Sequence, residues 1–424
     1  MTAFVVTMIV VVGVNTLLWV GAGLVRLAAA RLGGRPRHRG GRIPRPDEVA
    51  IVIAAHNEAL VIEATIRSAA RQVPVENVFV ACDGCTDDTV AIARACGATA
   101  LDIHPNRGKA GAIRAIVEEL ALADRFEVLL LLDADSQLHD DYLVSGLPAF
   151  ADPEVVAVAG RATTILDPPP ATVLGRILVA YRERLYLSVQ YLQKFGQAAR
   201  LLNAVTIVPG FASMYRTRVL ADIEIDAPGL AIEDYNMTFE VHAKRLGRIA
   251  FRPDAAIALT QDPDNLRDYR KQMRRWSLGF WQTVRRHGLH AGRFWALLAI
   301  SIGELVTSSV FMVLVLPILF VSVASAVVAA SGLDPSGVSA GIAGVLPPLA
   351  IVAGVLVPDY LLSILAAVLS RRPVYLLMGP VFPLLRMLDA WLCLRAMADA
   401  FSRRRVDGRW ASPERRAVGE ASAG

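Results

Sequence analysis

Apolar residues divide the chain into three blocks with different patterns. Residues 4–25 form one uncharged apolar run, residues 46–290 mix apolar and polar positions, and residues 294–400 are mostly apolar again. The middle block holds about 245 residues, which is long enough to bury a sizeable core. The pattern therefore predicts a globular domain between two apolar terminal segments.

The middle block alternates short apolar runs with segments of helical periodicity. The runs that predict strands lie at 49–55, 78–81, 99–103 and 127–132. The segments that predict helices lie at 60–71, 87–95, 109–122 and 235–246. This alternation is typical of an α/β fold with a mostly parallel sheet and helices on both faces. Such sheets bind ligands beyond the carboxyl ends of their strands, where this chain has Asn57, Glu58, Asp83, Asp133 and Asp135.

The N-terminal run Phe4–Val25 contains 22 residues, enough to cross the ~30 Å core of a bilayer as one helix. Arginines follow this run at Arg26, Arg31, Arg35, Arg37, Arg39, Arg42 and Arg45. Because basic residues are retained on the cytoplasmic side, the charges predict an inner-membrane protein with its N-terminus outside and its middle block in the cytoplasm.

The C-terminal apolar block contains further candidate spans. Residues 305–330 and 344–369 predict two membrane helices joined by an outer loop at 331–340. Residues 294–304 are apolar but too short to span, so they predict an interfacial helix that enters the second span. Residues 375–401 contain charged side chains that are costly in lipid, which favours an amphipathic or re-entrant helix at the cytoplasmic face.

These patterns predict five parts of the chain. They are an N-terminal transmembrane helix at 1–27, a basic linker at 28–47, a cytoplasmic domain at 48–290, interfacial and transmembrane helices at 291–402, and a cytoplasmic tail at 403–424.

The net charge of +5 does not indicate a nucleic-acid-binding protein, because the basic residues cluster beside the apolar segments and the middle block holds most of the acids. Cys82 and Cys85 have Cys-x-x-Cys spacing, but no second pair accompanies them. Reduced cytoplasmic thiols are the expected state.

The strongest chemical signal is the run Leu129–Leu132 followed by Asp133-Ala134-Asp135. If extended geometry continues, the two carboxylates point to the same side of the chain. They could then share a divalent cation with the phosphates of a substrate, although a solvated strand end would look the same. We expect Asp133 and Asp135 as candidate ligands of Mg²⁺ or Mn²⁺.

Other polar groups stand where a nucleotide could bind. Asp83 follows a strand and could accept hydrogen bonds from a base or ribose. Lys109 follows the turn Asn106-Arg107-Gly108 at a helix N-terminus, which suits a phosphate but is also typical of a surface turn. No sequence fingerprint of a P-loop or of a dinucleotide-binding site is present.

Two later segments could serve an acceptor. Asp234 precedes a helix and is either a helix cap or a base that deprotonates an acceptor hydroxyl. Gln272, Arg275 and Trp276 share one face of a predicted helix, where guanidinium suits diphosphate and the aromatic ring suits a sugar. A basic juxtamembrane helix with an interfacial tryptophan is the alternative.

In this order, the motifs resemble the membrane-bound branch of family 2 glycosyltransferases, which includes cellulose, hyaluronan, chitin-oligosaccharide and poly-N-acetylglucosamine synthases. The resemblance covers residues 48–282 and rests on Ala55-His56-Asn57-Glu58, Asp83-Gly84, Gly108-Lys109, Asp133-Ala134-Asp135, Glu233-Asp234 and Gln272-Met273-Arg274-Arg275-Trp276. The last motif matches the Gln-x-x-Arg-Trp signature. His56 departs from the family, which often has tyrosine there.

The resemblance implies a Rossmann-like GT-A fold and inverting transfer from a UDP-sugar with Mg²⁺ or Mn²⁺. It implies that Asn57, Glu58 and Asp83 lie near uridine, Lys109 near diphosphate, and Asp133 and Asp135 at donor and metal. It further implies that Asp234 is the base and that Gln272, Arg275 and Trp276 line the diphosphate and acceptor entrance. Residues 209–213 resemble the loop before the acceptor site, and Trp410 with Arg415-Arg416 resembles a tail of this branch.

Three functions remain open at this stage. A processive synthase would extend a polysaccharide or oligosaccharide, which the Gln-x-x-Arg-Trp motif favours. A non-processive enzyme would transfer one sugar to a lipid carrier or glycolipid. A non-catalytic membrane scaffold is disfavoured by the intact carboxylates at 133, 135 and 234.

Overall fold

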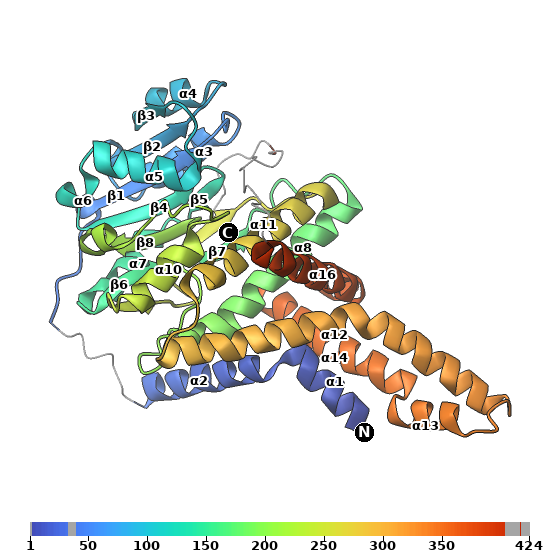
Figure 1. Cartoon of the computed structure of the whole chain (residues 1–424). Coiled ribbons are helices and arrows are strands. Elements are labelled where there is room, and N and C mark those ends of the chain that lie inside the picture. Colours follow the sequence, from blue (N-terminus) through green and yellow to red (C-terminus); the bar gives the residue numbers. More distant parts are fainter. Residues whose placement is uncertain (1, 33–39, 403–415, 417–424) are drawn as a thin grey trace.

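A seven-stranded sheet forms the centre of the computed structural model, which describes residues 2–32, 40–402 and 416 (Figure 1). The strand order is β3-β2-β1-β4-β8-β6-β9. The strands are β1 (Val49–Ala55), β2 (Val78–Asp83), β3 (Thr99–Ile103), β4 (Val128–Asp133), β6 (Val155–Ala159), β8 (Ala212–Arg216) and β9 (Arg248–Ala250). Only β8 runs against its neighbours, β4 and β6, so the sheet is mixed. The predicted α/β fold and its four strands are confirmed, whereas the pattern did not predict β6, β8 and β9.

The alternation of side chains along β1 explains why the sheet is buried on both faces. Ile51 and Ile53 belong to the hydrophobic cluster on one face, together with Ile62 of helix α3 (Ile62–Ala70). Val52 belongs to the cluster on the opposite face, together with Ile113 of α5 (Gly108–Glu119). A strand that is covered on both faces is apolar throughout, which is why β1 appears in the sequence as a continuous apolar run.

A second sheet of three strands extends the domain beyond β4. It has the order β5-β10-β7, with β5 (Ser136–Leu138), β7 (Arg161–Thr164) and β10 (Ile257–Thr260). The surrounding helices are α4 (Thr89–Ala95), α6 (Leu122–Arg125), α7 (Tyr142–Gly146), α8 (Val173–Ser188), α9 (Phe195–Gln197), α10 (Asp234–Ala243) and α11 (Leu266–His287). A π-helical turn, Val189–Lys194, joins α8 to α9. The helices predicted at 60–71, 87–95, 109–122 and 235–246 correspond to α3, α4, α5 and α10.

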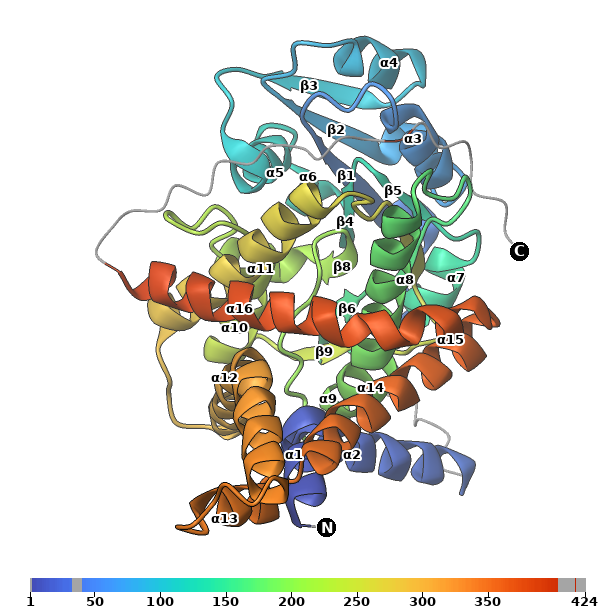
Figure 2. The ribbon, with the colours of Figure 1, turned by 90° about the vertical axis from the view of Figure 1, so that its right-hand side faces the viewer.

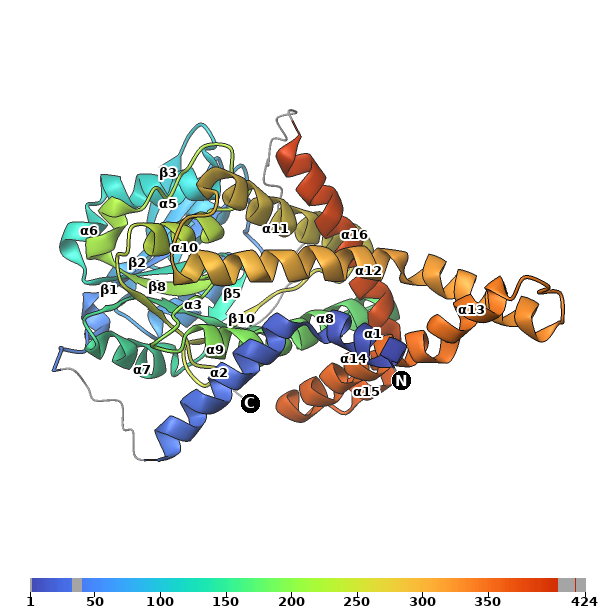
Figure 3. The ribbon, with the colours of Figure 1, turned by 60° about the horizontal axis from the view of Figure 1, so that its bottom comes forward.

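Long apolar helices leave the domain on one side (Figures 1 and 3). Within the described residues, three helical segments are long and apolar enough to cross a membrane: 293–330, 338–370 and 374–401. The first is α12 (Arg293–Ala330), and the second contains α13 (Val338–Val345) and α14 (Pro348–Ser370). The chain therefore has the elements of a membrane protein, as the sequence predicts.

The interfacial helix predicted at 294–304, entering the second span, corresponds to the first turns of the 38-residue helix α12, which continues through 305–330. Trp295 and Leu298 are buried in the same hydrophobic cluster as Phe239 of α10 and Trp281 of α11. At 1.5 Å per residue the helix is about 57 Å long, so it can reach from the domain through a ~30 Å hydrocarbon core. The loop predicted at 331–340 is shorter in the structure, because α13 begins at Val338.

The N-terminal helix predicted at 4–25 is broken in the structure, although its two halves together are long and apolar enough for one bent span. Residues 2–31 form two helices, α1 (Thr2–Val12) and α2 (Val14–Arg31), which meet at Gly13 with a bend of 67°. Gly13 has a positive φ of 87°, and its backbone approaches the carboxylate of Glu304 from α12 so closely that a Cβ there would lie 2.0 Å from Oε1. Glu304 Oε2 accepts a hydrogen bond of 2.6 Å from the backbone N–H of Asn15 in the first turn of α2. The break is therefore stabilised by a residue from another helix.

Residues 374–401 form α15 (Val374–Met378), a short 3₁₀ turn and α16 (Phe382–Phe401). Figure 2 shows α16 lying across the molecule, at a large angle to α12 and α14. Its Asp399 pairs with Arg274 of α11 at 2.7 Å. The segment is also long enough to span, so its predicted position at the membrane surface stays a prediction.

Candidate active site

The carboxyl ends of β2, β1 and β4 place Asp83 and Asp133 at one edge of the sheet. Ala55 of β1 is in register with Cys82, and Ala54 is in register with Asp133. Asp83 Oδ1 accepts a hydrogen bond of 2.7 Å from the backbone N–H of Arg107, which holds the loop before α5 against this edge. Burial raises the pKa of Asp83, and the N–H of Arg107 offsets part of that effect.

Lys109 lies at the N-terminus of α5 and binds two carboxylates. Its Nζ is 2.7 Å from Asp133 Oδ1 and 2.9 Å from Glu233 Oε1. Burial alone would lower the pKa of Lys109, but the charges of Asp133, Glu233 and Asp234 raise it well above its ordinary value. One ammonium thus joins the Asp-x-Asp segment to the Glu-Asp segment, which are 100 residues apart in the sequence.

Asp234 is the third carboxyl of this cluster. Burial, and next the negative charge of Glu233, raise the pKa of Asp234 to about 8. Burial acts on Glu233 in the same direction, but Lys109 outweighs it and lowers the pKa of Glu233. Two neighbouring carboxyls in one site are therefore driven to opposite protonation states, an arrangement that is typical of acid and base roles.

Gly210 lies directly against this carboxyl pair. A Cβ at Gly210 would lie 2.2 Å from Asp234 Oδ1 and 3.1 Å from Glu233 Oε1. Only a glycine lets the backbone before β8 approach Asp234 so closely. The segment 209–213, predicted as a loop beside the acceptor site, does adjoin Asp234 and continues into β8 at Ala212.

Asn57 and Glu58 connect the loops after β1 and β2. Asn57 has a positive φ of 55°, and its Oδ1 accepts a hydrogen bond of 2.8 Å from the backbone N–H of Thr86. The backbone N–H of Glu58 donates to Thr89 Oγ1 at 2.9 Å, and Glu58 itself is buried. Both residues stand beside the strand ends, as predicted, and they also shape the loops themselves.

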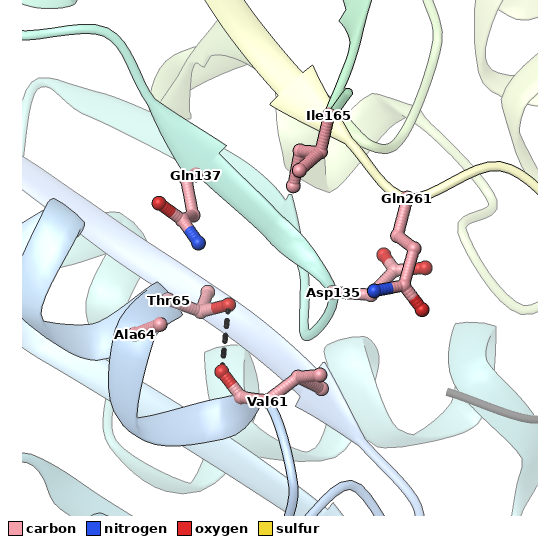
Figure 4. A pocket seen from close by; sticks show the side chains of 7 residues that line it. All are labelled: Val61, Ala64, Thr65, Asp135, Gln137, Ile165 and Gln261. Carbon is pink, nitrogen blue, oxygen red and sulfur yellow. Dashed lines mark hydrogen bonds between the residues drawn. The ribbon is translucent and has the colours of Figure 1, made fainter. Parts of the chain in front are cut away.

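Asp135 does not continue the extended strand from Asp133, because β4 ends at Asp133 and a turn follows at 134–135. The assumption that extended geometry continues from Asp133 to Asp135 was therefore wrong. The two side chains still interact, because the charge of Asp135 raises the pKa of Asp133, after the larger effect of burial. Asp135 lines a small hollow together with Gln137 and Gln261, and its other walls are Val61, Ala64, Thr65 and Ile165 (Figure 4).

Within the described part of the chain, no three His, Cys, Asp or Glu residues form a ready metal site. Asp133 and Asp135 nevertheless offer the hard oxygen donors that Mg²⁺ or Mn²⁺ prefers, and magnesium is usually held by one or two carboxylates plus substrate phosphates. The donor set therefore fits a divalent cation that arrives with a nucleotide-sugar.

Helix α11 packs on the loop that carries Glu233 and Asp234. Gln282 Oε1 accepts a hydrogen bond of 2.7 Å from the backbone N–H of Ala231. Gly279 lies so close to Ile232 that a Cβ there would be 2.2 Å from Cγ1. The helix with Gln272, Arg275 and Trp276 is therefore fixed directly against the candidate base.

The ring of Trp276 packs against a buried ion pair that the sequence did not reveal. The guanidinium of Arg182 lies 4.3 Å from the centre of the Trp276 ring, and Arg182 Nε is 3.1 Å from Asp262 Oδ1. Tyr186 and Thr164 donate further hydrogen bonds to Asp262, of 2.8 and 2.7 Å. Gln272 Oε1 is buried without a hydrogen-bond partner in the described structure.

Sequence reasoning missed Glu233 as a functional group, although the Glu-Asp pair was visible. It also missed Lys194, a buried lysine in the π-helical turn. Burial lowers the pKa of Lys194 to about 8, although the charge of Asp234 acts in the opposite direction. No sequence signal distinguishes this lysine from a surface one.

The predicted tail lies outside the described residues except for Arg416, so Trp410 and Arg415 are not placed. The backbone of Arg416 exchanges two hydrogen bonds with the side chain of Gln261, at 2.9 and 3.0 Å. Its side chain lies 3.4 Å from Asp264. Arg416 thus adjoins the hollow of Asp135.

The family model described as "Glycosyltransferase like family 2" matches residues 44–279, more than half of the chain. The chain belongs to glycosyltransferase family 2. The match ends three residues after Trp276 and includes the carboxylates of the candidate active site, from Glu58 to Asp264. None of the curated proteins matches this glycosyltransferase in sequence.

One solved structure supports the fold, and a second is a weaker match. A mannosyltransferase from Pyrobaculum calidifontis, in complex with GDP-Man and Mn²⁺, superposes with a TM-score of 0.52 at 19% identity, covering 89% of this chain and 99% of its own. Glucosyl-3-phosphoglycerate synthase from Mycobacterium tuberculosis, with Mn²⁺, UDP-glucose and glycerol 3-phosphate, matches with a TM-score of 0.38 at 18% identity, covering 63% of this chain and 85% of its own. The Pyrobaculum structure supports the GT-A-like fold, including the region after the catalytic domain.

Proposed function

We propose that this glycosyltransferase is a membrane-bound enzyme that transfers a sugar, with inversion, from a UDP-sugar to a growing polysaccharide or oligosaccharide at the cytoplasmic membrane face. The observation that carries the proposal is the cluster of Asp133, Glu233 and Asp234 around Lys109, beside helices long enough to span a bilayer. The sequence resemblance to the membrane-bound synthases supports the processive form.

In the proposed reaction, Asp234 is the base. An acceptor hydroxyl is a weak nucleophile, so a carboxylate must remove its proton as the new bond forms. The buried position of Asp234 beside Glu233 gives it a high proton affinity, and a base with a pKa near the working pH is the most effective. Lys109 lowers the pKa of Glu233, opposes the effect of burial on Asp133 and holds both carboxyls in place while Asp234 accepts the proton.

On the donor side, we propose that Asn57, Glu58 and Asp83 contact the uridine and that Gln272, Arg275 and Trp276 line the diphosphate and acceptor entrance. Asp135, with Asp133, would hold Mg²⁺ or Mn²⁺. The cation, when bound, neutralises the charge that develops on the diphosphate leaving group. The observation that the Pyrobaculum relative was crystallised with Mn²⁺ and a nucleotide-sugar agrees with this assignment.

Asp234→Asn tests the reaction. We expect turnover to fall by at least about 10³-fold, because the buried amide cannot accept the proton. A loss of this size lies within the range that general-base catalysis contributes. Donor binding, measured by isothermal titration calorimetry, should change little. Asp254→Asn, in an exposed ion pair with Arg252, is the matched control and should retain full activity. Normal turnover of Asp234→Asn would remove this residue as the base.

A non-processive enzyme that loads one sugar onto a lipid carrier or glycolipid is the second candidate, because the site is placed beside apolar helices that could present a lipid acceptor. A product-length assay with radiolabelled UDP-glucose, UDP-N-acetylglucosamine or UDP-glucuronate separates the two. A ladder of products means chain extension, and a single lipid-soluble product means one transfer.

A further inference from the structure

Helix α2 has its polar and apolar faces arranged the opposite way from a helix on the surface of a soluble protein. Asn15, Trp19 and Gly23 are buried, at intervals of four residues along one face. The opposite face exposes large apolar side chains, with Leu17 at 55%, Leu24 at 60% and Val25 at 70%. A continuous exposed apolar face of this kind marks a surface that is covered by something other than water.

The inward face of α2 carries the polar contacts. Thr16 Oγ1 accepts a hydrogen bond of 3.1 Å from Gln193 in the π-helical turn. Arg26 donates to the backbone carbonyl of Phe195 at 2.9 Å and lies 4.3 Å from the centre of the Phe195 ring. Arg26 therefore points to the catalytic domain, whereas Arg31 is exposed at the end of the helix, and the outward face from Val14 to Leu27 is apolar.

Close backbone contacts hold α2 firmly to the domain. Gly196 lies against the backbone of Trp19, where a Cβ would be 2.1 Å from the Trp19 carbonyl oxygen. Gly23 lies against the ring of Phe195, where a Cβ would be 3.2 Å from Cδ1. Because α2 is fixed along the side of a folded domain, protein covers one of its faces and lipid could reach only the opposite face.

The direction of α2 leads to the same conclusion. It is bent by 67° from α1, and α1 packs along the candidate span α14, where a Cβ at Gly354 would lie 2.6 Å from Thr7 Cβ. Figure 1 shows α1 running beside α14 while α2 turns away along the base of the domain. If α14 crosses the membrane, α2 is directed along the plane of the membrane rather than through it.

We propose that α2 lies in the bilayer surface, with its outward leucines and valines in the boundary between headgroups and acyl chains and its inward face on the catalytic domain. The occupant of its apolar face is the lipid leaflet, because this face is continuous through α1 with helices whose exposed side chains are also apolar, such as Leu314 and Val321 of α12. A helix with one apolar face binds in this way, buried by about 5–10 Å.

The proposal is tested by measuring how deep two pairs of residues lie in the membrane. Leu17 and Leu24 are seven residues apart on the same face, which separates them by about 10 Å along the helix axis. Leu314 and Val321 of α12 form a matched pair with the same spacing and 45% and 47% exposure. Each position is changed to cysteine in a Cys96→Ala background, since Cys82, Cys85 and Cys393 are buried. Each variant of the full chain is labelled with bimane and reconstituted into phosphatidylcholine vesicles.

Quenching by lipids brominated at shallow or deep acyl positions then gives the depth of each label. We expect Leu17→Cys and Leu24→Cys to report the same shallow depth within about 3 Å, whereas Leu314→Cys and Val321→Cys differ by up to about 10 Å, the rise of seven helical residues. A difference of that size between positions 17 and 24 would overturn the proposal in favour of a span. Absence of quenching at both positions, with quenching at 314, would overturn it in favour of water or another protein. The measurement needs no turnover, so it stands apart from the proposed transferase activity.

Discussion

At the residue scale, the candidate site depends on an imbalance of charge. Three carboxyls, of Asp133, Glu233 and Asp234, surround the single ammonium of Lys109. Lys109 contacts Asp133 and Glu233 directly, and so Asp234 has the weakest compensation of the three. Buried carboxyls without a cationic partner hold their protons to a high pH. This explains why a residue proposed as a base has the pKa that general-base catalysis near neutral pH requires.

The pH dependence of turnover follows from this pKa. Asp234 acts as a base only when it is deprotonated, and its pKa is raised to about 8. The ratio kcat/KM reports the protonation state of the free enzyme. We therefore expect kcat/KM to be low at acid pH and to rise with pH through an inflection near 8. Initial rates from pH 6 to 9.5, with donor binding measured over the same range, test this. A profile that is flat over this range would show that another group controls the proton.

Gly210 gives a second test at this scale. In Gly210→Ala the new methyl would meet Asp234 Oδ1 at 2.2 Å, so the carboxyl must move. Because small displacements of catalytic groups are costly, we expect kcat to fall by about 100-fold. Gly303→Ala is the matched control, since no atom lies within 4 Å of its Cβ position. Equal activities of the two variants would show that Asp234 does not need its present position.

At the scale of elements, the Gln-x-x-Arg-Trp helix is positioned by a buried ion pair rather than by lipid. Arg182 of α8 lies beneath Trp276 of α11 and binds Asp262 after β10. Both partners of the pair are almost completely buried, with 0% and 1% of their side chains exposed. Removal of one partner would leave the other charge buried and unpaired, which is far more costly than loss of a surface pair.

We therefore expect Arg182→Met to destabilise the protein by about 3–5 kcal/mol, and Arg252→Met, in an exposed pair with Asp254, by less than about 1 kcal/mol. Thermal unfolding in detergent, followed by tryptophan fluorescence, measures the difference. Similar midpoints for the two variants would mean that Asp262 finds another partner and that the pair does not hold α8 to α11.

The elements that could be predicted from the sequence are those whose pattern is local. β1 to β4 are short apolar runs that end in polar residues, and the helices between them have clear periodicity, so both their type and the strand ends with Asp83 and Asp133 were predictable. The break at Gly13 was not, because it is stabilised by the carboxylate of Glu304, which is 289 residues beyond its partner Asn15. The roles of Arg182 and Lys194 were hidden for the same reason, since their partners come from distant strands and helices.

At the scale of the whole molecule, the catalytic domain and the apolar helices are joined by charged groups. Arg184 of α8 binds Asp359 of α14, with 2.7 Å between Nη1 and Oδ2, and both side chains are buried. Asp389 of α16 accepts hydrogen bonds from Tyr181 of α8, at 3.0 Å, and from Tyr269 of α11, at 2.7 Å. Figure 3 shows α8 and α14 converging in this region. The active site is thereby held in a fixed position relative to the candidate membrane helices.

Substitutions of this ion pair test how the two parts are joined. In Asp359→Leu the guanidinium of Arg184 loses its buried partner, although Arg184 still lies near the Ser363 hydroxyl at 3.3 Å. We expect a loss of about 3–5 kcal/mol in stability, because an unpaired buried charge is strongly destabilising. The double variant Arg184→Met/Asp359→Leu removes both charges, and we expect it to recover most of that loss.

Thermal unfolding in detergent and turnover in vesicles are measured for all three proteins. Recovery of stability without recovery of turnover would mean that the pair positions the site relative to the bilayer. Recovery of both would mean that apolar contacts between α8 and α14 suffice for the junction. A double variant as unstable as Asp359→Leu alone would contradict the pairing itself, because the cost of an isolated charge would then not explain the loss.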